Sequence, residues 1–260
     1  MLRRVTATRY VTPLREGGSL PGLMEADDLG TYVVKFVGAG QGRKTLVAEV
    51  ICAGLARAAG LRVPDLVAVD LDPALAAGEP DQEVQDLLRA SAGLNLGVDF
   101  LPGALDLDRP ATVVDSDWAA RLLWFDAFVG NVDRSWRNPN LLLWHGDLWV
   151  IDHGASVYFH HGWQRGVTDP ARFAAQAWDA GGHVFETCAR RAWELDEEIA
   201  APLDRAAFTE VLATVPDVWL EPVPGADGAG ELGPDALRAA YVDFLTARLG
   251  TRQWLPGVAP

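Results

Sequence analysis

The chain has 260 residues, of which 49% are hydrophobic and 22% charged, and its formal net charge is −14. This composition is typical of a folded globular protein and excludes a wholly disordered or fibrous chain. The negative field repels nucleic-acid backbones and anionic lipid head groups, so we expect neither as a partner. The length predicts either one two-lobed unit or two small domains in contact.

Several features of the sequence favour the cytoplasm. No stretch reaches the roughly 18 uninterrupted apolar residues of a membrane span, because Arg121 and Asp126 interrupt the most apolar run. Residues 1–11 carry arginines that no apolar segment follows, so we expect no secretory signal. Cys52 and Cys188 are too few for a disulfide framework, and their apolar surroundings predict two buried thiols.

A glycine-rich turn, a strand and a helix follow one another in the first quarter of the chain. Residues 16–22 (EGGSLPG) form the glycine-rich turn, and an acidic turn follows at residues 25–30. Residues 31–37 (TYVVKFV) are β-branched and aromatic with turn signals on both sides, which predicts a strand. Residues 45–61 carry apolar side chains at helical spacing, so we expect one helix that a glycine ends.

Two further strands are predicted at residues 63–70 and 94–101, with an insertion between them. The insertion, residues 73–92, carries glycine, proline and acidic residues around a short helix-like piece. We therefore expect it to be a mobile excursion on the surface.

A proline, a glycine and a polar stretch after the last of these strands predict a boundary between two lobes, residues 1–104 and 105–260. The second lobe begins with a buried helix at residues 116–129, where a Ser-x-Asp cap signal precedes an apolar face and Gly130 ends it.

Residues 140–151 predict a β-hairpin, because two apolar runs flank the turn His145-Gly146-Asp147. The same triplet, His-Gly-Asp, occurs as a motif in aminoglycoside phosphotransferases, but Asp152 stands where their pattern has Asn. We therefore interpret the triplet as a turn. Beyond Asp152 the sequence is predicted to be helical.

The lysines of the chain are unusual, because 20 of its 22 basic residues are arginine. Lys35 lies inside an apolar predicted strand, and a buried ammonium needs an anion nearby. Glu49 is a plausible partner, since its helix must pack back against that strand. The alternative is that Lys35 reaches solvent at a strand edge while Glu49 is solvated.

Acidic and amide side chains gather around the predicted hairpin. Asp133 and Asn138 stand five apart in a loop, which suits a carboxylate base and an amide metal ligand facing one site. Asn140 could replace Asn138 as that ligand. Asp152 follows the second hairpin strand and precedes a glycine by two residues, which is a suitable place to bind Mg²⁺.

The order strand lysine, helix glutamate, Asp-x4-Asn loop, hairpin and Asp-x-Gly resembles the signature motifs of protein kinases. The chain is more closely similar to the HipA-like kinases over most of residues 10–160. The motifs that carry this resemblance are GGSLPG, YVVKF, AEVICAGLA, GNVDRSWRNPNLLL and WVIDHGAS.

The resemblance implies an α+β, two-lobed protein-kinase-like fold with a small mixed-sheet N-lobe and a mostly helical C-lobe. It implies a serine/threonine kinase that uses ATP and Mg²⁺ and acts on a protein substrate. Lys35 would bind the α and β phosphates and pair with Glu49, Asp133 would orient or deprotonate the acceptor hydroxyl, and Asn138 and Asp152 would bind Mg²⁺.

The resemblance also assigns residues to the nucleotide. The turn that contains Gly17, Gly18 and Ser19 would cover the phosphates, and Phe100 and Leu101 would contribute to the nucleotide site. Ser19 matches a serine whose phosphorylation can switch such kinases off.

Some residues depart from the kinase pattern. Gly130-Asn131-Val132 precede Asp133 where ordinary protein kinases have His-Arg, and His153 stands where they have Phe. No Ala-Pro-Glu signature follows, so we do not expect activation-loop control. The chain is shorter than the toxin members of the family and is expected to lack their N-terminal extension, so an antitoxin partner is not implied.

Two other functions stay open. Because residues 160–260 would hold the acceptor and carry no readable motif, the acceptor could be a small molecule or a lipid head group. A nucleotide-binding pseudokinase scaffold is the other alternative. We interpret His153, His160 and His161 as surface or loop histidines rather than metal ligands, and Trp136 as a packing residue that could instead touch substrate.

Overall fold

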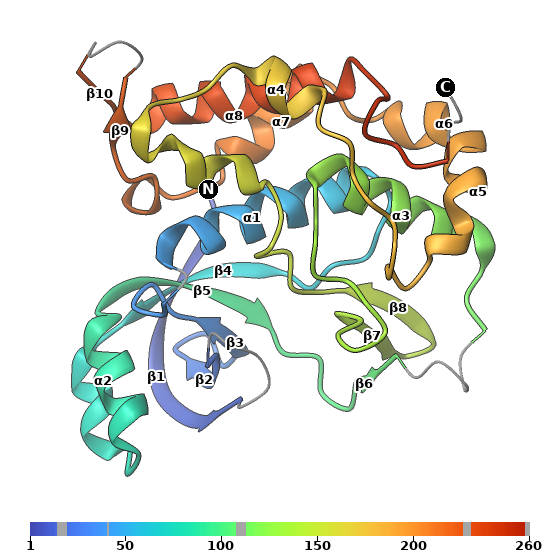
Figure 1. Cartoon of the computed structure of the whole chain (residues 1–260). Helices are drawn as coiled ribbons and strands as arrows, with labels where there is room; N and C mark the ends of the chain where they lie inside the picture. The colour runs from blue at the N-terminus through green and yellow to red at the C-terminus, as the bar shows by residue number, and fades with distance from the viewer. Residues whose placement is uncertain (15–19, 41, 108–112, 226–229, 258–260) are drawn as a thin grey trace. The chain divides into compact units, whose positions relative to one another are not determined.

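The computed structural model describes the chain except for residues 15–19, 41, 108–112, 226–229 and 258–260 (Figure 1). Its backbone contacts separate two compact units, Met1–Val47 with Pro64–Gly103, and Ala48–Val63 with Ala104–Pro260. Residues 48–63, which we expected in the N-lobe, therefore group with the second unit. Helix α1 (Gly42–Ala58) spans the change from one unit to the other.

The first unit is a five-stranded closed barrel with the strand order β1-β2-β3-β5-β4. Strands β1 and β4 pair in parallel, whereas the other neighbours are antiparallel. The elements, in chain order, are β1 (Arg3–Pro13), β2 (Gly22–Ala26), β3 (Thr31–Lys35), β4 (Leu66–Leu71), the 3-10 helix η1 (Pro73–Gly78), α2 (Gln82–Ala90) and β5 (Gly93–Asp99).

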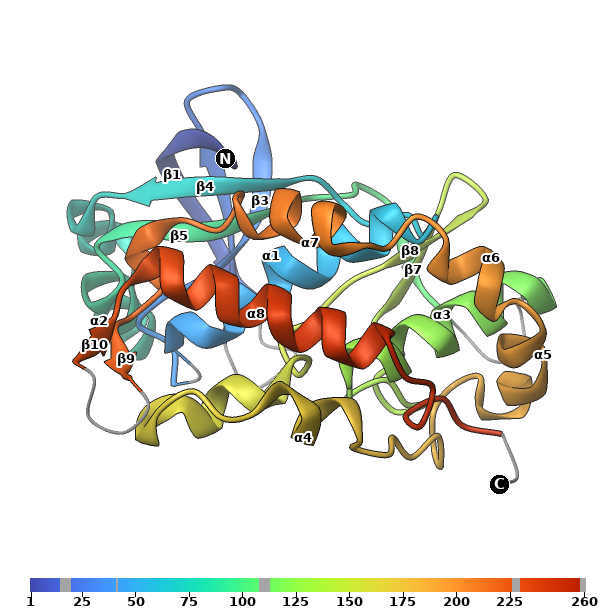
Figure 2. The ribbon, with the colours of Figure 1, turned by 90° about the horizontal axis from the view of Figure 1, so that it is seen from above.

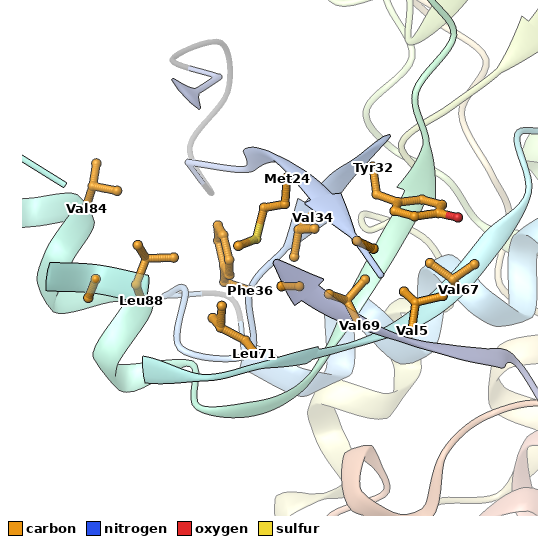
Figure 3. Packing of buried hydrophobic residues seen from close by; sticks show 13 residues of the cluster. Val5, Met24, Tyr32, Val34, Phe36, Val67, Val69, Leu71, Val84 and Leu88 are labelled. Atoms are coloured by element: carbon orange, nitrogen blue, oxygen red, sulfur yellow. The ribbon is translucent and has the colours of Figure 1, made fainter. Parts of the chain in front are cut away.

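Alternating side chains of these strands fill the barrel (Figure 3). In β3 the side chains of Tyr32 and Val34 are buried, and Phe36 continues the alternation into the same core. Lys35 lies between them in the alternation, so it belongs to the outer face of the barrel and is half-buried. This intermediate exposure lies between the buried and the solvent-reaching positions that the sequence left open.

Strands β1 and β2 are absent from the sequence-based expectations. The signal was present in β1, where Val5 and Ala7 are buried and their neighbours are exposed, a period of two. The arginines and threonines around them obscured this pattern, because they make the segment polar on average. Arg3, Arg4 and Arg9 are exposed and form ion pairs with Asp28, Asp70 and Glu25.

Residues 73–92 lie at the surface as expected, but they pack one face onto the barrel's core. Val84 and Leu88 of α2 and Ala76 of η1 are buried in the same cluster as the strand residues (Figure 3). Asp72 and Asp81 cap the two helices by accepting hydrogen bonds from backbone amides. The polar residues that suggested a loop therefore cap the two helices or lie on the solvent-facing side of α2.

The second unit combines a small sheet with many helices, several of them short (Figures 1 and 2). Helix α8 packs against α4 and α7. The elements are β6 (Leu105–Asp106), α3 (Ser116–Val129), β7 (Leu141–Trp144), β8 (Asp147–Val150), η2 (Tyr158–Arg165), α4 (Pro170–Ala174), η3 (Glu186–Cys188), α5 (Ala189–Glu194), α6 (Asp196–Ala200), α7 (Arg205–Leu212), η4 (Asp217–Trp219), β9 (Val223–Pro224), β10 (Glu231–Leu232) and α8 (Pro234–Leu249).

Helix α3 and the hairpin that follows it agree with the sequence-based expectations. Asp115 caps α3, and Gly130 ends it in the left-handed conformation with φ 67°. The hairpin turn consists of His145 and Gly146, both with positive φ, as a two-residue turn requires. The His-Gly-Asp triplet is therefore a turn, as predicted.

Arg248 of α8 fixes the end of α3. Its buried guanidinium donates to the carbonyls of Ala127 and Phe128, at 2.7 and 2.8 Å, and to that of Phe173 at 2.6 Å. Burial lowers the pKa of Arg248 to about 9, so the group stays charged at neutral pH. A cation there stabilises the carbonyl end of the helix dipole, from which the following loop begins.

Cys52 is buried as expected, and burial raises the pKa of its thiol. Cys188 is only half-buried, so the prediction of a second buried thiol is wrong. In the part of the chain that the structure describes, no helix is both long and apolar enough to span a bilayer.

The barrel predicts a sharp difference between two glycine substitutions. A Cβ at Gly97 in β5 would lie 2.6 Å from Val69 Cγ2 and 2.7 Å from Val67 Cγ2. We expect Gly97→Ala to lower the free energy of unfolding by about 1–3 kcal/mol, because the core has no room for the methyl group. Gly78→Ala, whose Cβ would meet nothing within 4 Å, should not lower it. Urea denaturation measures both, and equal stabilities would contradict this packing.

Candidate active site

The loop after α3 brings Asp133 and Asn138 together. Asn138 Nδ2 donates to Asp133 Oδ2 at 3.1 Å, and both side chains are exposed. The backbone of Asp133 is held on both sides, since its amide donates to Asn131 Oδ1 at 3.0 Å and its carbonyl accepts from Asn140 Nδ2 at 2.8 Å. The loop therefore presents a fixed carboxylate to solvent.

A tight turn separates these two residues. The amide and carbonyl groups of Ser135 and Asn138 bond reciprocally, at 3.1 and 3.0 Å, so Trp136 and Arg137 form the tip of a two-residue turn. Ser135 also pairs with His183. The backbone of Asn138 is consequently fixed by the turn.

A buried ion pair lies beneath the loop. Asp126 of α3 and Arg134 are both fully buried, with Arg134 Nε 2.5 Å from Asp126 Oδ2. His183 Nε2 lies 3.0 Å from the same oxygen, and Asn131 Nδ2 donates to Asp126 Oδ1 at 2.9 Å. Burial alone would raise the pKa of Asp126, but Arg134 and His183 hold it well below its usual range. Asp126 is therefore ionised at neutral pH.

Arg134 also connects the loop to the hairpin strand that leads to Asp152. Its guanidinium donates to the carbonyl of Asn140 at 2.7 Å and lies 3.4 Å from that of Ile151. The amide of Ile151 donates to Asn140 at 3.1 Å. Asp152 then follows in the left-handed conformation with φ 54°, and its side chain is exposed.

Glu49 binds the backbone on the other side of Asp152. This glutamate is buried, and its Oε2 accepts a hydrogen bond from the amide of His153 at 3.0 Å. The His153 ring is buried as well and packs edge-on against Phe125. The metal-ligand candidate Asp152 is thus followed by an anchored residue. The expected ion pair of Lys35 with Glu49 stays a prediction.

The nucleotide residues expected in the first unit are only partly described. Gly17, Gly18 and Ser19 lie outside the described residues. Phe100 is 37% exposed and Leu101 is buried directly after β5. Their roles stay predictions.

His153 lies in a loop as expected, but neither it nor His160 is at the surface. His153 and His160 are buried, and His160 Nδ1 lies 2.8 Å from the hydroxyl of Tyr241. Burial raises the pKa of that tyrosine. Among the described residues there is no group of three or more His, Cys, Asp or Glu side chains that could hold a metal ion.

Sequence analysis missed the supporting residues Asp126, Arg134 and His183. The first left a signal, because a lone carboxylate in the apolar run LLWFDAFV must be paired if the helix is buried. His183 left none, since nothing in its neighbourhood indicates a contact with a residue 57 positions earlier.

The candidate metal ligands suit Mg²⁺ in their chemistry. Asp152 offers carboxylate oxygens, and Asn138, whose Nδ2 is used by Asp133, retains its carboxamide oxygen as a ligand. Magnesium is commonly held by one or two such protein oxygens together with phosphates and water. Asn140 suits this role less, because it is buried and its carboxamide is bonded to the loop backbone.

The chain belongs to the HipA-like kinase family, whose model matches residues 8–238. Comparison with curated proteins gives no match.

Two of the solved structures that match the chain are kinases. The proinflammatory kinase CtkA of Helicobacter pylori aligns with a TM-score of 0.53 and 10% identity, over 93% of this chain and 96% of that one. A Golgi casein kinase aligns with a TM-score of 0.38 and 11% identity, over 96% of this chain and 71% of that one. The expected α+β kinase-like fold is confirmed.

The buried ion pair predicts a large loss of stability on neutralisation. We expect Asp126→Asn to lower the free energy of unfolding by about 3–5 kcal/mol, because Arg134 would remain buried without its counter-charge. Asp117→Asn is the matched control, since Asp117 lies in the same helix and pairs with Arg191 at the surface. That change should have little effect in urea denaturation, and similar losses in both variants would contradict the assignment.

The same carboxylate predicts a pH dependence. Its folded pKa lies below the unfolded value of about 3.9, so its stabilisation is present above that pH and is lost as the pH falls further. We expect the unfolding free energy of the wild type to fall between about pH 5 and 2, and that of Asp126→Asn to fall less steeply. Urea denaturation at each pH measures both unfolding free energies. If they fell with pH at the same rate in the two proteins, the role assigned to Asp126 would be contradicted.

Proposed function

We propose that this family member is an ATP- and Mg²⁺-dependent serine/threonine kinase that transfers the γ-phosphoryl group to a hydroxyl of a protein substrate. The observation that carries the proposal is the bonded pair of Asp133 and Asn138, fixed above a buried ion pair that also holds the strand leading to Asp152. Phosphoryl transfer depends mainly on positioning and charge neutralisation, which such a rigid loop supplies.

Each polar residue of the site has a role in this proposal. Asp133 accepts the hydrogen bond of the acceptor hydroxyl and takes its proton, and Asn138 keeps that carboxylate oriented. Asn138 and Asp152 hold Mg²⁺, which neutralises phosphate charge when it is bound. Glu49 steadies the backbone after Asp152 through the amide of His153. Lys35 binds the α and β phosphates.

Removal of the proposed base should separate turnover from binding. We expect Asp133→Asn to lower kcat by about 10²- to 10⁴-fold and leave the Kd of ATP unchanged, because the carboxylate acts on the acceptor. Transfer of labelled phosphate from ATP to protein, including self-phosphorylation, gives kcat, and calorimetry gives the Kd. A variant as active as the wild type would refute this role.

Removal of the proposed metal ligand should act on binding instead. With the wild type, Mg²⁺ should tighten ATP binding in titration calorimetry, whereas with Asp152→Asn binding should be equally weak with and without the metal. Glu210→Gln, a change at an exposed residue of α7, should behave as the wild type. Absence of ATP binding by the wild type in every condition would overturn the kinase proposal and favour a scaffold.

A further inference from the structure

The guanidinium of Arg137 stands out because most other arginines that the structure describes are engaged. Arg134 is in a buried ion pair, Arg248 is bonded to carbonyls, and arginines at the surface pair with carboxylates, as Arg121 does with Glu198. The exceptions within the described ranges are Arg137, Arg165 and Arg172, whose exposed guanidinium groups have no hydrogen bond or ion pair there.

Arg137 differs from the other two by its position. It occupies the tip of the turn between Ser135 and Asn138, directly before the residue whose carboxamide binds Asp133. The backbone pairing of Ser135 with His183 and the buried ion pair of Arg134 fix the position of that turn. The cation is thus carried by a fixed backbone in the same loop as Asp133, one residue before the Asn138 that bonds its carboxylate.

The charge of the chain makes this cation significant. In a protein of net charge −14, an unpaired arginine in the loop that carries the candidate base is a local point of attraction for an anion. A planar guanidinium binds carboxylate or phosphate oxygens through two parallel hydrogen bonds, which fixes orientation as well as affinity. Lys35 and Mg²⁺ already account for the nucleotide phosphates in the proposed mechanism.

We propose that Arg137 recognises an acidic side chain of the protein substrate close to the acceptor hydroxyl. The inference rests on the proposed kinase function and names its substrate class, a protein segment with a carboxylate near the phosphorylated serine or threonine. An ion pair with Arg137 places that segment beside Asp133. Arg137 therefore contributes to substrate binding rather than to the transfer itself.

A positional-scanning library of serine and threonine peptides tests the inference without a known substrate. The wild type should prefer Asp or Glu at one or more positions near the acceptor, Arg137→Ala should lose that preference, and Arg137→Glu should favour Arg or Lys there. For the best acidic peptide, Arg137→Ala should raise KM by about tenfold or more while kcat and the KM for ATP stay unchanged. Arg172→Ala, which removes another unpaired exposed arginine, should match the wild type.

Three outcomes would overturn the inference. The first is a wild type without acidic preference, and the second is an Arg137→Ala variant that keeps the preference. The third is an equal fall in kcat with acidic and neutral peptides, which would assign Arg137 to the transferred phosphoryl group.

If the wild type binds Mg²⁺ and ATP but phosphorylates no peptide, the acidic-protein substrate is refuted while the nucleotide site stands. Absence of ATP binding would instead refute the proposed function itself.

Discussion

The ion pair between Asp126 and Arg134 is the interaction on which the candidate site depends. Both groups are fully buried, so each would destabilise the fold without the other. The remaining donors of Arg134 reach backbone carbonyls of the loop and of the hairpin strand, and His183 and Asn131 occupy the other positions on the carboxylate. This buried ion pair thus fixes the loop and the hairpin strand that follow α3, together with His183, which lies 57 positions after Asp126.

This arrangement explains how an exposed carboxylate can have a fixed position. Asp133 itself is exposed, but its amide, its carbonyl and one carboxylate oxygen are all bonded to asparagines of the same loop. The buried Asn131 and Asn140 thus hold its backbone, and the exposed Asn138 orients its carboxylate. The carboxylate keeps the access to solvent that a substrate hydroxyl needs, and it loses little entropy when a substrate binds.

Local signals were readable from the sequence, whereas long-range contacts were not. The bounds of α3 follow from its cap residue and Gly130, and the hairpin turn follows from a glycine between two apolar runs. The Asp133–Asn138 pair was predictable too, since five residues of one loop bring both side chains together. By contrast, only two side chains of β1 are buried, and they stand among polar residues. The sequence of α2 resembles a loop because only Val84 and Leu88 of this helix are buried. His183 contacts Asp126 across 57 positions of sequence, which no local pattern indicates.

Two arginines of the same loop show that burial decides whether a charge stabilises the fold or is accessible to a ligand. Arg134 is enclosed, and every donor that it directs at Asp126 or at a carbonyl lowers the cost of removing it from water. Arg137, three residues later, is at the tip of the turn and keeps its solvent shell. Since Asp126 neutralises the first, the second is the cation that the loop offers to solvent. A substitution at position 134 therefore acts on the fold, whereas one at position 137 acts on what the loop can bind.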